Sequence, residues 1–251
     1  MNYHFKTLLI NLNRSQDRLT HCTEQLQSAE IHFERIEAVD GEMLTQSAER
    51  SRFNADLNQQ NYHKNLNSGE IGCYLSHRKV WQKIVDEKLD FAIVLEDDFS
   101  LTGDLTAAIE VAKSSFKQWD YIKLAGHRRN RYPIHQQEIA DMQLVTYNKL
   151  PSQTCAQIVS FNGAKKLLAH SETFGRPVDV DIQHWWEADL LAFGLMPYVV
   201  TANNQFGSEI DRVAKRKQAR TRRLQKIKLQ FQFWRMNKKQ NKQRLRSLMA
   251  G

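Results

Sequence analysis

The chain has 251 residues, of which 41% are hydrophobic and 25% are charged, and it contains only 4 prolines and 10 glycines. This ordinary globular composition excludes an intrinsically disordered chain, and the length allows one large α/β domain or one domain with an appendage. The three cysteines, Cys22, Cys73 and Cys155, are widely separated and odd in number. They argue against a disulfide framework or a Cys-x-x-Cys metal site and fit a reducing cytoplasm.

The net charge of +8 is distributed unevenly along the chain. Residues 212–251 contain 15 lysines and arginines and no acid, so subtracting them from +8 leaves residues 1–211 with a net charge of −7. We therefore expect an acidic globular domain over residues 1–211 and a basic helical tail over residues 212–251. The first residues lack the apolar core of a secretory signal, and no run approaches the ~20 apolar residues that span a bilayer. A soluble or peripheral protein is expected.

The first predicted strand covers residues 7–12, and the helix that follows it can be capped by Ser15. Arg14 and Arg18 then lie where the strand ends. Their guanidinium groups can bind the phosphates of a nucleotide, or they can simply be solvated. A second predicted strand closes on an Asp-Gly turn at Asp40. The Asp40 carboxylate can contact ribose hydroxyls at the same edge of the sheet, with a plain turn as the alternative.

Residues 69–88 predict an amphipathic helix, because their apolar side chains recur at spacings of three and four. We expect this helix to pack beneath a central strand. It contains Ser76 and His77. A histidine in this position is either a buried core residue or a contact to a ligand.

The strongest motif is FAIVLEDDF, residues 91–99. Its five apolar residues favour a strand that is buried on both faces, as in a parallel sheet covered by helices. Glu96, Asp97 and Asp98 follow where the strand leaves the core, and open α/β sheets bind ligands beyond the carboxyl ends of their strands. Carboxylate oxygens suit Mg²⁺ or Mn²⁺, so a metal site is predicted here, with a solvated acidic turn as the alternative.

The second half of the chain predicts strands over residues 120–126, 143–147 and 154–161, then a helix capped by Asn162, and a last short strand over residues 197–200. Between them, residues 177–193 place several acids beside Trp185 and Trp186. Sugars stack on aromatic faces, and apolar rings raise the pKa of a neighbouring carboxyl group. This segment is therefore a candidate source of a general base.

Several segments, taken together and in order, carry a resemblance: LLINLNRSQDR, RIEAVDG, GEIGCYLSHRKVW, AIVLEDDF, YIKL, VSFNGAKKLL and PVD. Over about residues 5–210 the chain resembles glycosyltransferase family 25, which contains bacterial lipooligosaccharide galactosyltransferases and collagen galactosyltransferases. The resemblance implies an α/β fold of the GT-A type, with a Rossmann-like mixed sheet flanked by helices. It also implies an inverting transfer from UDP-galactose or UDP-glucose, with Mn²⁺ or Mg²⁺ as cofactor, to a lipid-linked oligosaccharide acceptor of lipopolysaccharide synthesis.

The resemblance also assigns roles to individual residues. The metal would be held by Glu96, Asp97 and Asp98, and the nucleotide and the rest of the donor would be lined by Asn11, Arg14, Arg18, Asp40, Glu70, Ser76 and His77. On the acceptor side, the PVD segment favours Asp179 as the catalytic base, with Asp181 and Glu187 as rivals, and His184 is a candidate third metal ligand. The sequence departs from the family pattern at TCAQIVSF, which replaces a glycine-rich run, and after PVD.

Two other functions use the same features. A metal-dependent phosphohydrolase or nucleotidyltransferase would use the same three acids to release phosphate or sugar without an acceptor. A nucleic-acid-binding protein would use the basic tail. The second alternative is disfavoured because the acidic domain would repel nucleic acid and no known reading element is recognisable, so no nucleic-acid partner is expected.

The tail combines basic and apolar residues at helical spacing. One predicted stripe consists of Leu224, Ile227, Phe231 and Trp234, and a second consists of Leu229, Phe233 and Met236. We expect one stripe to pack on the domain and the other to face the anionic inner-membrane surface, where lysine and arginine are attracted to acidic lipids. This interpretation predicts a cytoplasmic protein that is peripheral at the inner membrane, and a wholly solvated basic helix is the alternative.

Overall fold

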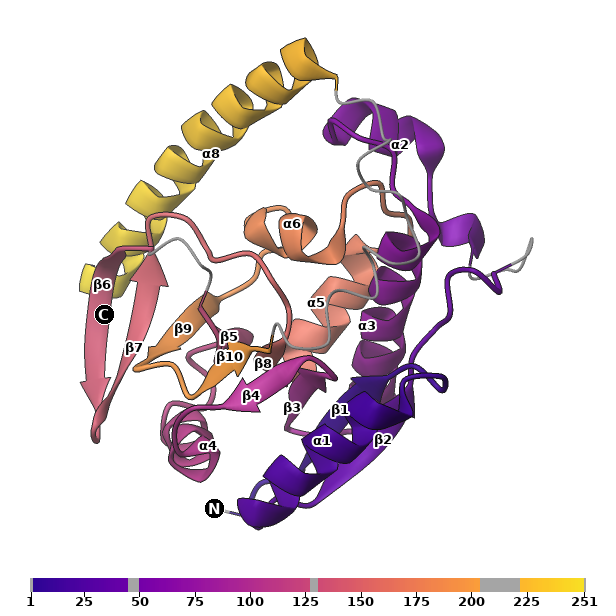
Figure 1. Ribbon diagram of the computed structural model, residues 1–251. Coiled ribbons are helices and arrows are strands. Elements are labelled where there is room, and N and C mark those ends of the chain that lie inside the picture. Colours follow the sequence, from indigo (N-terminus) through magenta and orange to yellow (C-terminus); the bar gives the residue numbers. More distant parts are fainter. Residues whose placement is uncertain (1, 45–49, 127–130, 204–221, 251) are drawn as a thin grey trace.

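The structure is a computed structural model that describes residues 2–44, 50–126, 131–203 and 222–250 (Figure 1). The chain forms, in order, β1 (Phe5–Asn11), α1 (Gln16–Ser28), β2 (Phe33–Glu37), a 3₁₀ turn (Arg50–Arg52), α2 (Ala55–Asn61), α3 (Ser68–Asp86), β3 (Phe91–Glu96), β4 (Phe99–Leu101), α4 (Leu105–Ser114), β5 (Tyr121–Lys123), β6 (Pro133–Ile139), β7 (Met142–Tyr147), β8 (Ala156–Ser160), α5 (Phe161–His170), α6 (Val178–Gln183), β9 (Ala192–Met196), β10 (Val200–Ala202) and α8 (Arg223–Ala250).

A mixed sheet with the strand order β2-β1-β3-β8-β5-β9-β7-β6 forms the centre of the molecule. The first three strands of this order are parallel, so their carboxyl ends meet at one edge, where Asn11 pairs with Glu37 and Ile10 with Glu96. The next strand, β8, runs antiparallel to β3. A separate small sheet of β4 and β10 lies beside it. The predicted α/β class, a mixed sheet flanked by helices with a basic C-terminal helix, is confirmed.

The central strand β3 is buried on both faces, which explains its uninterrupted apolar sequence. Ala92 and Val94 pack in the cluster formed with α3, α5 and α6. Phe91, Ile93 and Leu95 pack on the other side, with α1 and α4. All five side chains are completely buried. Because burying each large apolar side chain contributes about 1.5–3 kcal/mol, this strand fixes firmly the position of the acids that follow it.

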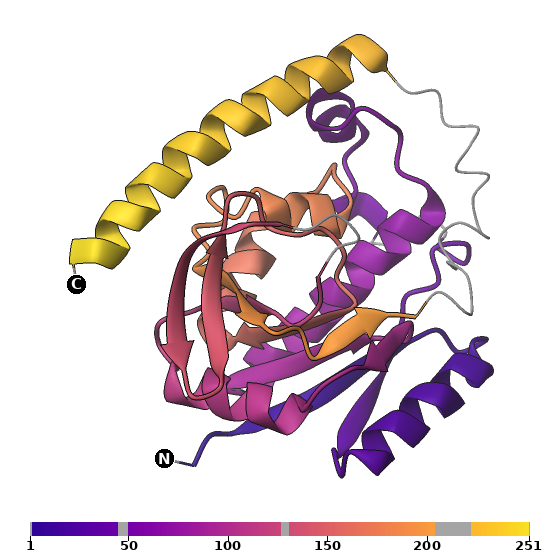
Figure 2. The same cartoon turned by 60° about the vertical axis from the view of Figure 1, so that its left-hand side comes forward.

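Helix α3 lies across one face of the sheet and begins with a capping box (Figure 2). The Asn67 side chain accepts a hydrogen bond of 2.8 Å from the Glu70 amide, and the Glu70 carboxylate accepts one of 3.0 Å from the Asn67 amide. This reciprocal pair satisfies two amides at the helix start. Glu70, predicted to lie near the donor, is only 7% exposed and has a structural role at the start of the helix.

Two predicted caps differ in the structure. Ser15 stands at the N-cap of α1 but makes no side-chain capping bond. Helix α5 begins two residues earlier than expected, so Ser160 and not Asn162 is the cap, accepting a bond of 3.0 Å from the Gly163 amide. Strands β4, β6 and β9 were not predicted. β4 has only three residues, and β6 is a mostly exposed, polar edge strand without an apolar pattern.

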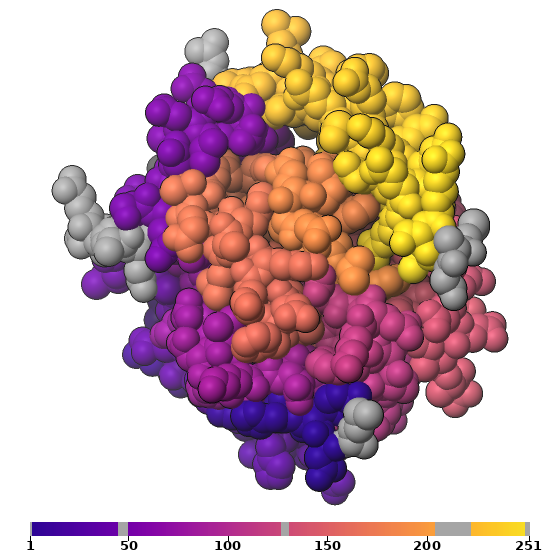
Figure 3. Space-filling model, turned by 180° about the vertical axis from the view of Figure 1, so that it is seen from behind, coloured from indigo at the N-terminus to yellow at the C-terminus, as the bar shows by residue number. Residues whose placement is uncertain are grey.

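The long helix α8 runs along the edge of the molecule from the α2 region to the β6–β7 hairpin (Figures 1 and 3). Asn237 and Asn241 attach it, donating hydrogen bonds of 2.5 and 3.0 Å to the Asn148 carbonyl. In the second predicted stripe, Phe233 and Met236 are half-buried. The other stripe, at Leu224, Ile227, Phe231 and Trp234, is 56–85% exposed.

No helix in the described part of the chain is both long and apolar enough to cross a bilayer. The predicted boundary between residues 211 and 212 lies outside the described residues, as does the first part of the predicted tail, residues 212–221.

The loop after β2 rests on α3 at two glycines. A Cβ atom on Gly72 would lie 2.6 Å from the Val39 carbonyl oxygen and 2.7 Å from the Gly41 nitrogen, and one on Gly41 would lie 1.8 Å from the Ser68 carbonyl oxygen. These contacts are to backbone atoms, which do not move aside easily. The glycines in the GEIG and VDG segments are therefore required by close approach of two backbones.

We predict that Gly72→Ala lowers the free energy of unfolding by about 1–3 kcal/mol, because the added methyl group overpacks this contact. Alanine is otherwise the better helix former by about 1 kcal/mol, so a loss of stability would be due to the contact itself. Urea unfolding measures the change. Gln82→Ala, on the exposed face of the same helix, is the control and should stay within about 0.5 kcal/mol of the wild type. Equal stability of Gly72→Ala and the control would contradict the prediction.

Candidate active site

A small hollow of about 110 Å³ opens at the carboxyl ends of β1, β2 and β3. Parallel strands bring these ends together, and the first helical turn of α1 and the middle of α3 close the sides. Among the residues predicted for the donor and the metal, the hollow is lined by Arg14, Arg18, Asp40, Ser76, His77, Glu96, Asp97 and Asp98. The structure thus gathers side chains that are up to 84 positions apart in the sequence, Arg14 to Asp98.

The Glu96 carboxylate is held by a relay of buried hydrogen bonds. Nε2 of His77 lies 2.8 Å from a Glu96 oxygen, and Nδ1 of His77 lies 3.4 Å from the Gln157 amide nitrogen. Gln157 in turn accepts a bond of 2.7 Å from the Tyr121 hydroxyl. This pattern places the proton of a neutral His77 on Nε2, so that the ring donates to Glu96. His77 is thus a positioning residue for the carboxylate.

The charge of Glu96 is stabilised in spite of its position at the edge of the core. Burial is the largest single effect and raises the pKa of Glu96, but the contact with His77, the hydrogen bond from Thr154 and the charge of Lys123 together outweigh it, and the pKa is lowered overall. Lys123 itself is buried, and burial lowers its pKa to about 8. Glu96 is therefore an anion at neutral pH.

Asp97 points into a different environment from its neighbours. One oxygen accepts a bond of 2.9 Å from Arg18, and the other accepts one of 2.8 Å from Asn11. Asn11 is completely buried and also accepts a bond of 2.9 Å from Arg35. Asn11 and Asp97 consequently join the ends of β1 and β3 to the start of α1, and the three acids do not act as one uniform group.

Asp98 has unused binding capacity. Its Oδ1 atom is buried and has no hydrogen-bond partner among the described residues. Burial, together with the negative charges of Glu96 and Asp97, raises the pKa of Asp98 to about 7. A buried carboxylate oxygen without a donor is costly, and a bound cation would relieve both the lost hydrogen bonding and the repulsion.

These observations fit a divalent cation held by Asp98 and Glu96. Both offer carboxylate oxygens, which are the ligands preferred by Mg²⁺ and Mn²⁺. Cys73, His77 and Glu96 also lie close enough to share an ion. Burial raises the pKa of the Cys73 thiol well above its usual value, and His77 is already bonded to Glu96, so this trio fits a cation less well.

The remaining donor-side residues position the loop after β2. Arg14 forms an ion pair with Asp40 at the mouth of the hollow. The Ser76 hydroxyl accepts a bond of 2.8 Å from the Val39 amide and donates one of 2.7 Å to the Gly72 carbonyl. Ser76 therefore supports the loop that carries Asp40, beside the glycine contact described above.

Two of the three candidate bases are engaged in a separate ion-pair cluster. Asp181 accepts hydrogen bonds of 2.5 Å from Tyr74 and 3.0 Å from Arg176, and Arg176 also pairs with Glu187. The hydrogen bond to Asp181 raises the pKa of His170, which favours a charged partner there as well. Paired with cations in this way, Asp181 and Glu187 are poor candidates for a base, and they hold α6 against α3 and α5.

Asp179 differs from both. Its oxygens accept bonds from the amides of Val180, at 2.8 Å, and Gln153, at 3.3 Å, and the side chain is half-buried. Its charge affects Cys73 and Lys123, the same residues that are affected by Glu96. Asp179 thus lies near the carboxyl end of β3. His184, the suggested third ligand, lies elsewhere: its Nδ1 atom is 2.9 Å from the Val180 carbonyl oxygen and its ring packs on Phe233.

The sequence interpretation missed the residues that orient the acids, namely Gln157, Tyr121, Lys123, Arg35 and Arg176. A signal existed for Lys123, since a lysine within the apolar YIKL run is unusual for a buried strand. No local pattern marks Gln157, because a glutamine within a short strand is as readily exposed as buried.

Comparison with known proteins gives the family of the chain. The family model described as glycosyltransferase family 25 (LPS biosynthesis protein) matches residues 4–182. The chain therefore belongs to glycosyltransferase family 25.

Its relatives in animals are longer proteins. Procollagen galactosyltransferase 1-B of Xenopus laevis is 28% identical over 229 residues, which is 81% of this chain but 37% of that protein. Inactive glycosyltransferase 25 family member 3 of Homo sapiens is 29% identical over 225 residues, covering 80% of this chain and 37% of that protein. Family membership alone does not, therefore, establish turnover.

Among solved structures, one similar chain is a glycosyltransferase involved in the glycosylation of the major capsid of PBCV-1. The TM-score is 0.47 at 8% identity, and the match covers 84% of this chain and 97% of that one.

We predict that Asp98→Asn stabilises the metal-free protein by about 1–3 kcal/mol at pH 8, because it removes a carboxylate whose ionisation is opposed by burial. The folded-state pKa of about 7 exceeds the ordinary value of 3.8. The cost of ionisation is thus present in full above pH 7 and disappears as the pH falls from 7 towards 4. The advantage of the variant should shrink over the same range. Unfolding in urea at several pH values, with EDTA present, measures it.

The exposed acid Asp141, changed to Asn, is the control and should show no such pH dependence. Added Mn²⁺ should stabilise the wild type more than Asp98→Asn. A variant that is less stable than the wild type at pH 8, or an equal response of both to Mn²⁺, would contradict the assignment of Asp98.

Proposed function

We propose that the chain is an inverting, metal-dependent glycosyltransferase that moves galactose from UDP-galactose to a lipooligosaccharide or lipopolysaccharide glycan and forms a β-linkage. The observation that carries the proposal is the Asp98 oxygen that has no hydrogen-bond partner among the described residues, beside Glu96, whose carboxylate is oriented by His77. Family membership and the galactosyltransferase names of its relatives support the choice of reaction and of sugar.

In the proposed reaction, Glu96 and Asp98 hold Mn²⁺ or Mg²⁺. The cation, when bound, neutralises the negative charge that develops on UDP as the sugar leaves. Arg14 and Lys123 add positive charge around the same edge of the sheet. Asp40, at the end of the loop held by Ser76, lies where the ribose would be expected in a doubly wound sheet.

Asp179 is the proposed base. It would take the proton from the acceptor hydroxyl, whose oxygen then attacks the anomeric carbon from the side opposite to UDP. Attack from that side inverts the configuration and gives a β-linkage from an α-linked donor. The backbone amides of Val180 and Gln153 orient the Asp179 carboxylate. Its orientation therefore does not depend on the ion-pair cluster formed by Asp181, Arg176 and Glu187.

The direct test is a donor screen without acceptor. UDP-galactose, UDP-glucose and UDP-N-acetylhexosamines are incubated with the purified protein and Mn²⁺, and UDP release is measured. We expect slow release that requires the metal and is fastest with UDP-galactose. Release of inorganic phosphate would indicate a phosphohydrolase instead, and no turnover with any donor would place the chain with the relatives that are named inactive.

The variant Asp179→Asn tests the base in the same assay once an acceptor glycan is added. It should bind UDP and Mn²⁺ as the wild type does, while transfer falls by about 10²-fold or more, because a base acts only in the chemical step. Glu187→Gln is the matched control and should retain transfer. The opposite result, loss of transfer in Glu187→Gln and normal transfer in Asp179→Asn, would assign the base to Glu187.

We further propose that the protein is cytoplasmic and associates with the inner membrane through the outer face of α8. The stripe at Leu224, Ile227, Phe231 and Trp234 is exposed and is flanked by exposed cations, including Lys228 and Arg235. Apolar side chains entering the interface and cations facing acidic lipid headgroups are the two components of peripheral binding.

The full chain should sediment with vesicles containing phosphatidylglycerol at low salt, dissociate as salt increases, and ignore phosphatidylcholine vesicles. Changing Ile227 and Phe231 together to Ser should weaken this binding, whereas Gln232→Ser, on an exposed position of the same helix, should not. Equal binding to both kinds of vesicle, or binding to neither, would contradict membrane association.

A further inference from the structure

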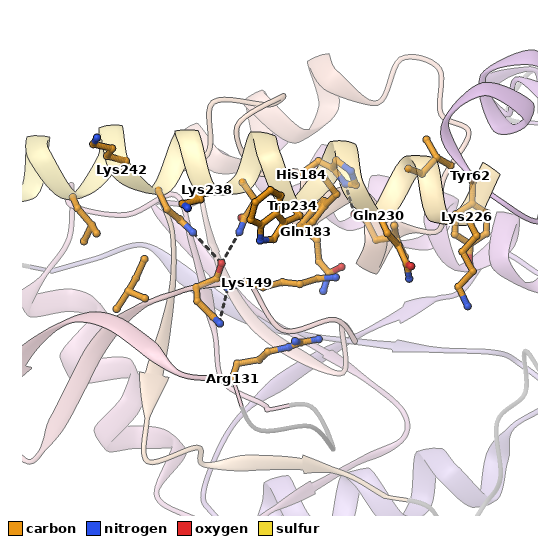
Figure 4. Close-up of a pocket in the computed structure, with 18 of the residues that line it drawn as sticks. Tyr62, Arg131, Lys149, Gln183, His184, Lys226, Gln230, Trp234, Lys238 and Lys242 are labelled. Carbon is orange, nitrogen blue, oxygen red and sulfur yellow. Dashed lines mark hydrogen bonds between the residues drawn. The ribbon is translucent and has the colours of Figure 1, made fainter. Parts of the chain in front are cut away.

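A second and larger hollow, of about 1070 Å³, lies between α8 and the body of the protein (Figure 4). Its walls are the inner side of α8, the end of α6, the segment after α2 and the residues that flank the β6–β7 hairpin. A volume of this order holds a ligand of several rings. The hollow is distinct from the donor-side hollow, with which it shares no lining residue.

The lining is strongly basic. Six cationic side chains surround the hollow: Arg131, Lys149, Lys226, Lys238, Lys242 and Arg246. Among the described residues, the lining contains no aspartate or glutamate. Concave, low-dielectric walls lined by one sign of charge concentrate the electrostatic potential, so this hollow attracts anions. Burial lowers the pKa of Lys149, the neighbouring charge of Arg131 lowers it further, and the charge of Asp179 opposes the shift.

The lining also offers groups that bind sugars. The amide oxygens of Asn237 and Asn241 are buried and have no hydrogen-bond partner in the described ranges, and the same holds for Nε of Arg131. Phe233 lies at the same wall, with Lys149 4.5 Å from its ring centre. Trp234, the one member of the exposed stripe that also lines the cavity, has Lys238 5.4 Å from its ring centre. Amides that can bind hydroxyl groups, rings on which sugars stack, and cations together match a charged carbohydrate better than a purely apolar ligand.

The hollow is adjacent to the proposed base. Val180 and Gln183 of α6 form part of its wall, and Asp179 precedes Val180 in the first turn of that helix. The charge of Asp179 also acts on Lys149 inside the hollow. Asp179 therefore lies between the two hollows, with the metal-binding acids on one side and the basic cavity on the other.

We infer that the cavity beneath α8 binds an acidic portion of the acceptor, a sugar bearing a phosphate or carboxylate group, and presents its neighbouring hydroxyl to Asp179. The statement that the bound sugar is the acceptor rests on the proposed function. The statement that the cavity binds an anion rests only on the residues that line it. Helix α8 then has two roles on two sides. Its outer stripe faces the membrane, and its inner side forms a wall of the acceptor site.

The anion in this cavity belongs to a sugar and not to a lipid headgroup. Arg131 and Lys149 belong to the body of the protein, beneath α8, whereas the exposed apolar stripe of α8 points outward. Changing the two body residues should therefore affect sugar binding and leave vesicle binding unchanged.

The experiment measures binding of glucose 6-phosphate and of glucose to the full chain by NMR titration, without a sugar donor and with UDP and Mn²⁺ added to fill the other hollow. Glucose 6-phosphate should bind at least about tenfold more tightly than glucose, since each hydrogen bond to a charged group contributes substantially. Arg131→Gln and Lys149→Gln should each weaken glucose 6-phosphate binding by about tenfold and leave glucose binding unchanged.

Three controls locate the site. Lys228→Gln and Arg235→Gln, on exposed positions of α8 that do not line the cavity, should bind glucose 6-phosphate within about twofold of the wild type. Arg14→Gln should also bind it as the wild type does, because Arg14 belongs to the donor-side hollow. Vesicles of phosphatidylglycerol should sediment Lys149→Gln as well as the wild type.

Equal affinity for glucose and glucose 6-phosphate, or normal binding by Arg131→Gln and Lys149→Gln, would overturn the inference. It would also be overturned if Lys149→Gln lost only vesicle binding, since the anion would then be a lipid headgroup. Because no transfer is measured, a failed donor screen leaves these results interpretable, and failure here leaves the donor reaction untouched.

Discussion

Three consecutive carboxylates at the end of a buried strand are the constraint on which the rest of the site depends. Like charges this close together repel, and burial increases the cost of each. Each acid has different partners. Glu96 accepts a hydrogen bond from His77, and Asp97 accepts hydrogen bonds from Arg18 and Asn11. Only Asp98 keeps an oxygen that no described residue satisfies. Glu96 and Asp97 are thus held in place by their partners, whereas Asp98 is available for a ligand.

The same arrangement explains why α1 and α3 lie where they do. Arg18 and His77 are buried polar residues, 6% and 1% exposed, whose partners are the carboxylates of β3. Each helix is therefore tied to the carboxyl end of the sheet by a charged contact as well as by its apolar face. The glycine contact between α3 and the loop after β2 adds a third attachment, made by backbone atoms alone. A displacement of α3 would disturb Glu96 and the Asp40 loop together.

Helix α8 illustrates how one amphipathic segment can serve two surroundings. Attachment to the body is local: Asn237 and Asn241 bond to a single carbonyl group, Phe233 packs against the His184 ring, and Arg244 packs over the rings of Trp185 and Phe193. Between these contacts and the α2 region the helix bridges a cavity instead of packing tightly. A tightly packed helix would leave no room for a ligand, whereas a detached helix would supply no wall, so this partial contact is what makes the basic cavity possible.

The sequence by itself determined the features that depend on local pattern: the doubly buried strand before the acids, the amphipathic helix after GEIG, the two stripes of the tail, and the segments that identify the family. It could not determine which acid has which partner, because the deciding contacts join distant positions. Asn11 and Asp97 are 86 positions apart, His77 and Gln157 are 80 apart, and Tyr74 and Asp181 are 107 apart. Asp179, Asp181 and Glu187 look alike in the sequence, and only the packing of α6 against Arg176 and Tyr74 separates them. The cavity beneath α8 is likewise a product of tertiary structure, since its charge is assembled from three separate segments whose individual lysines and arginines are indistinguishable in the sequence from ordinary surface residues.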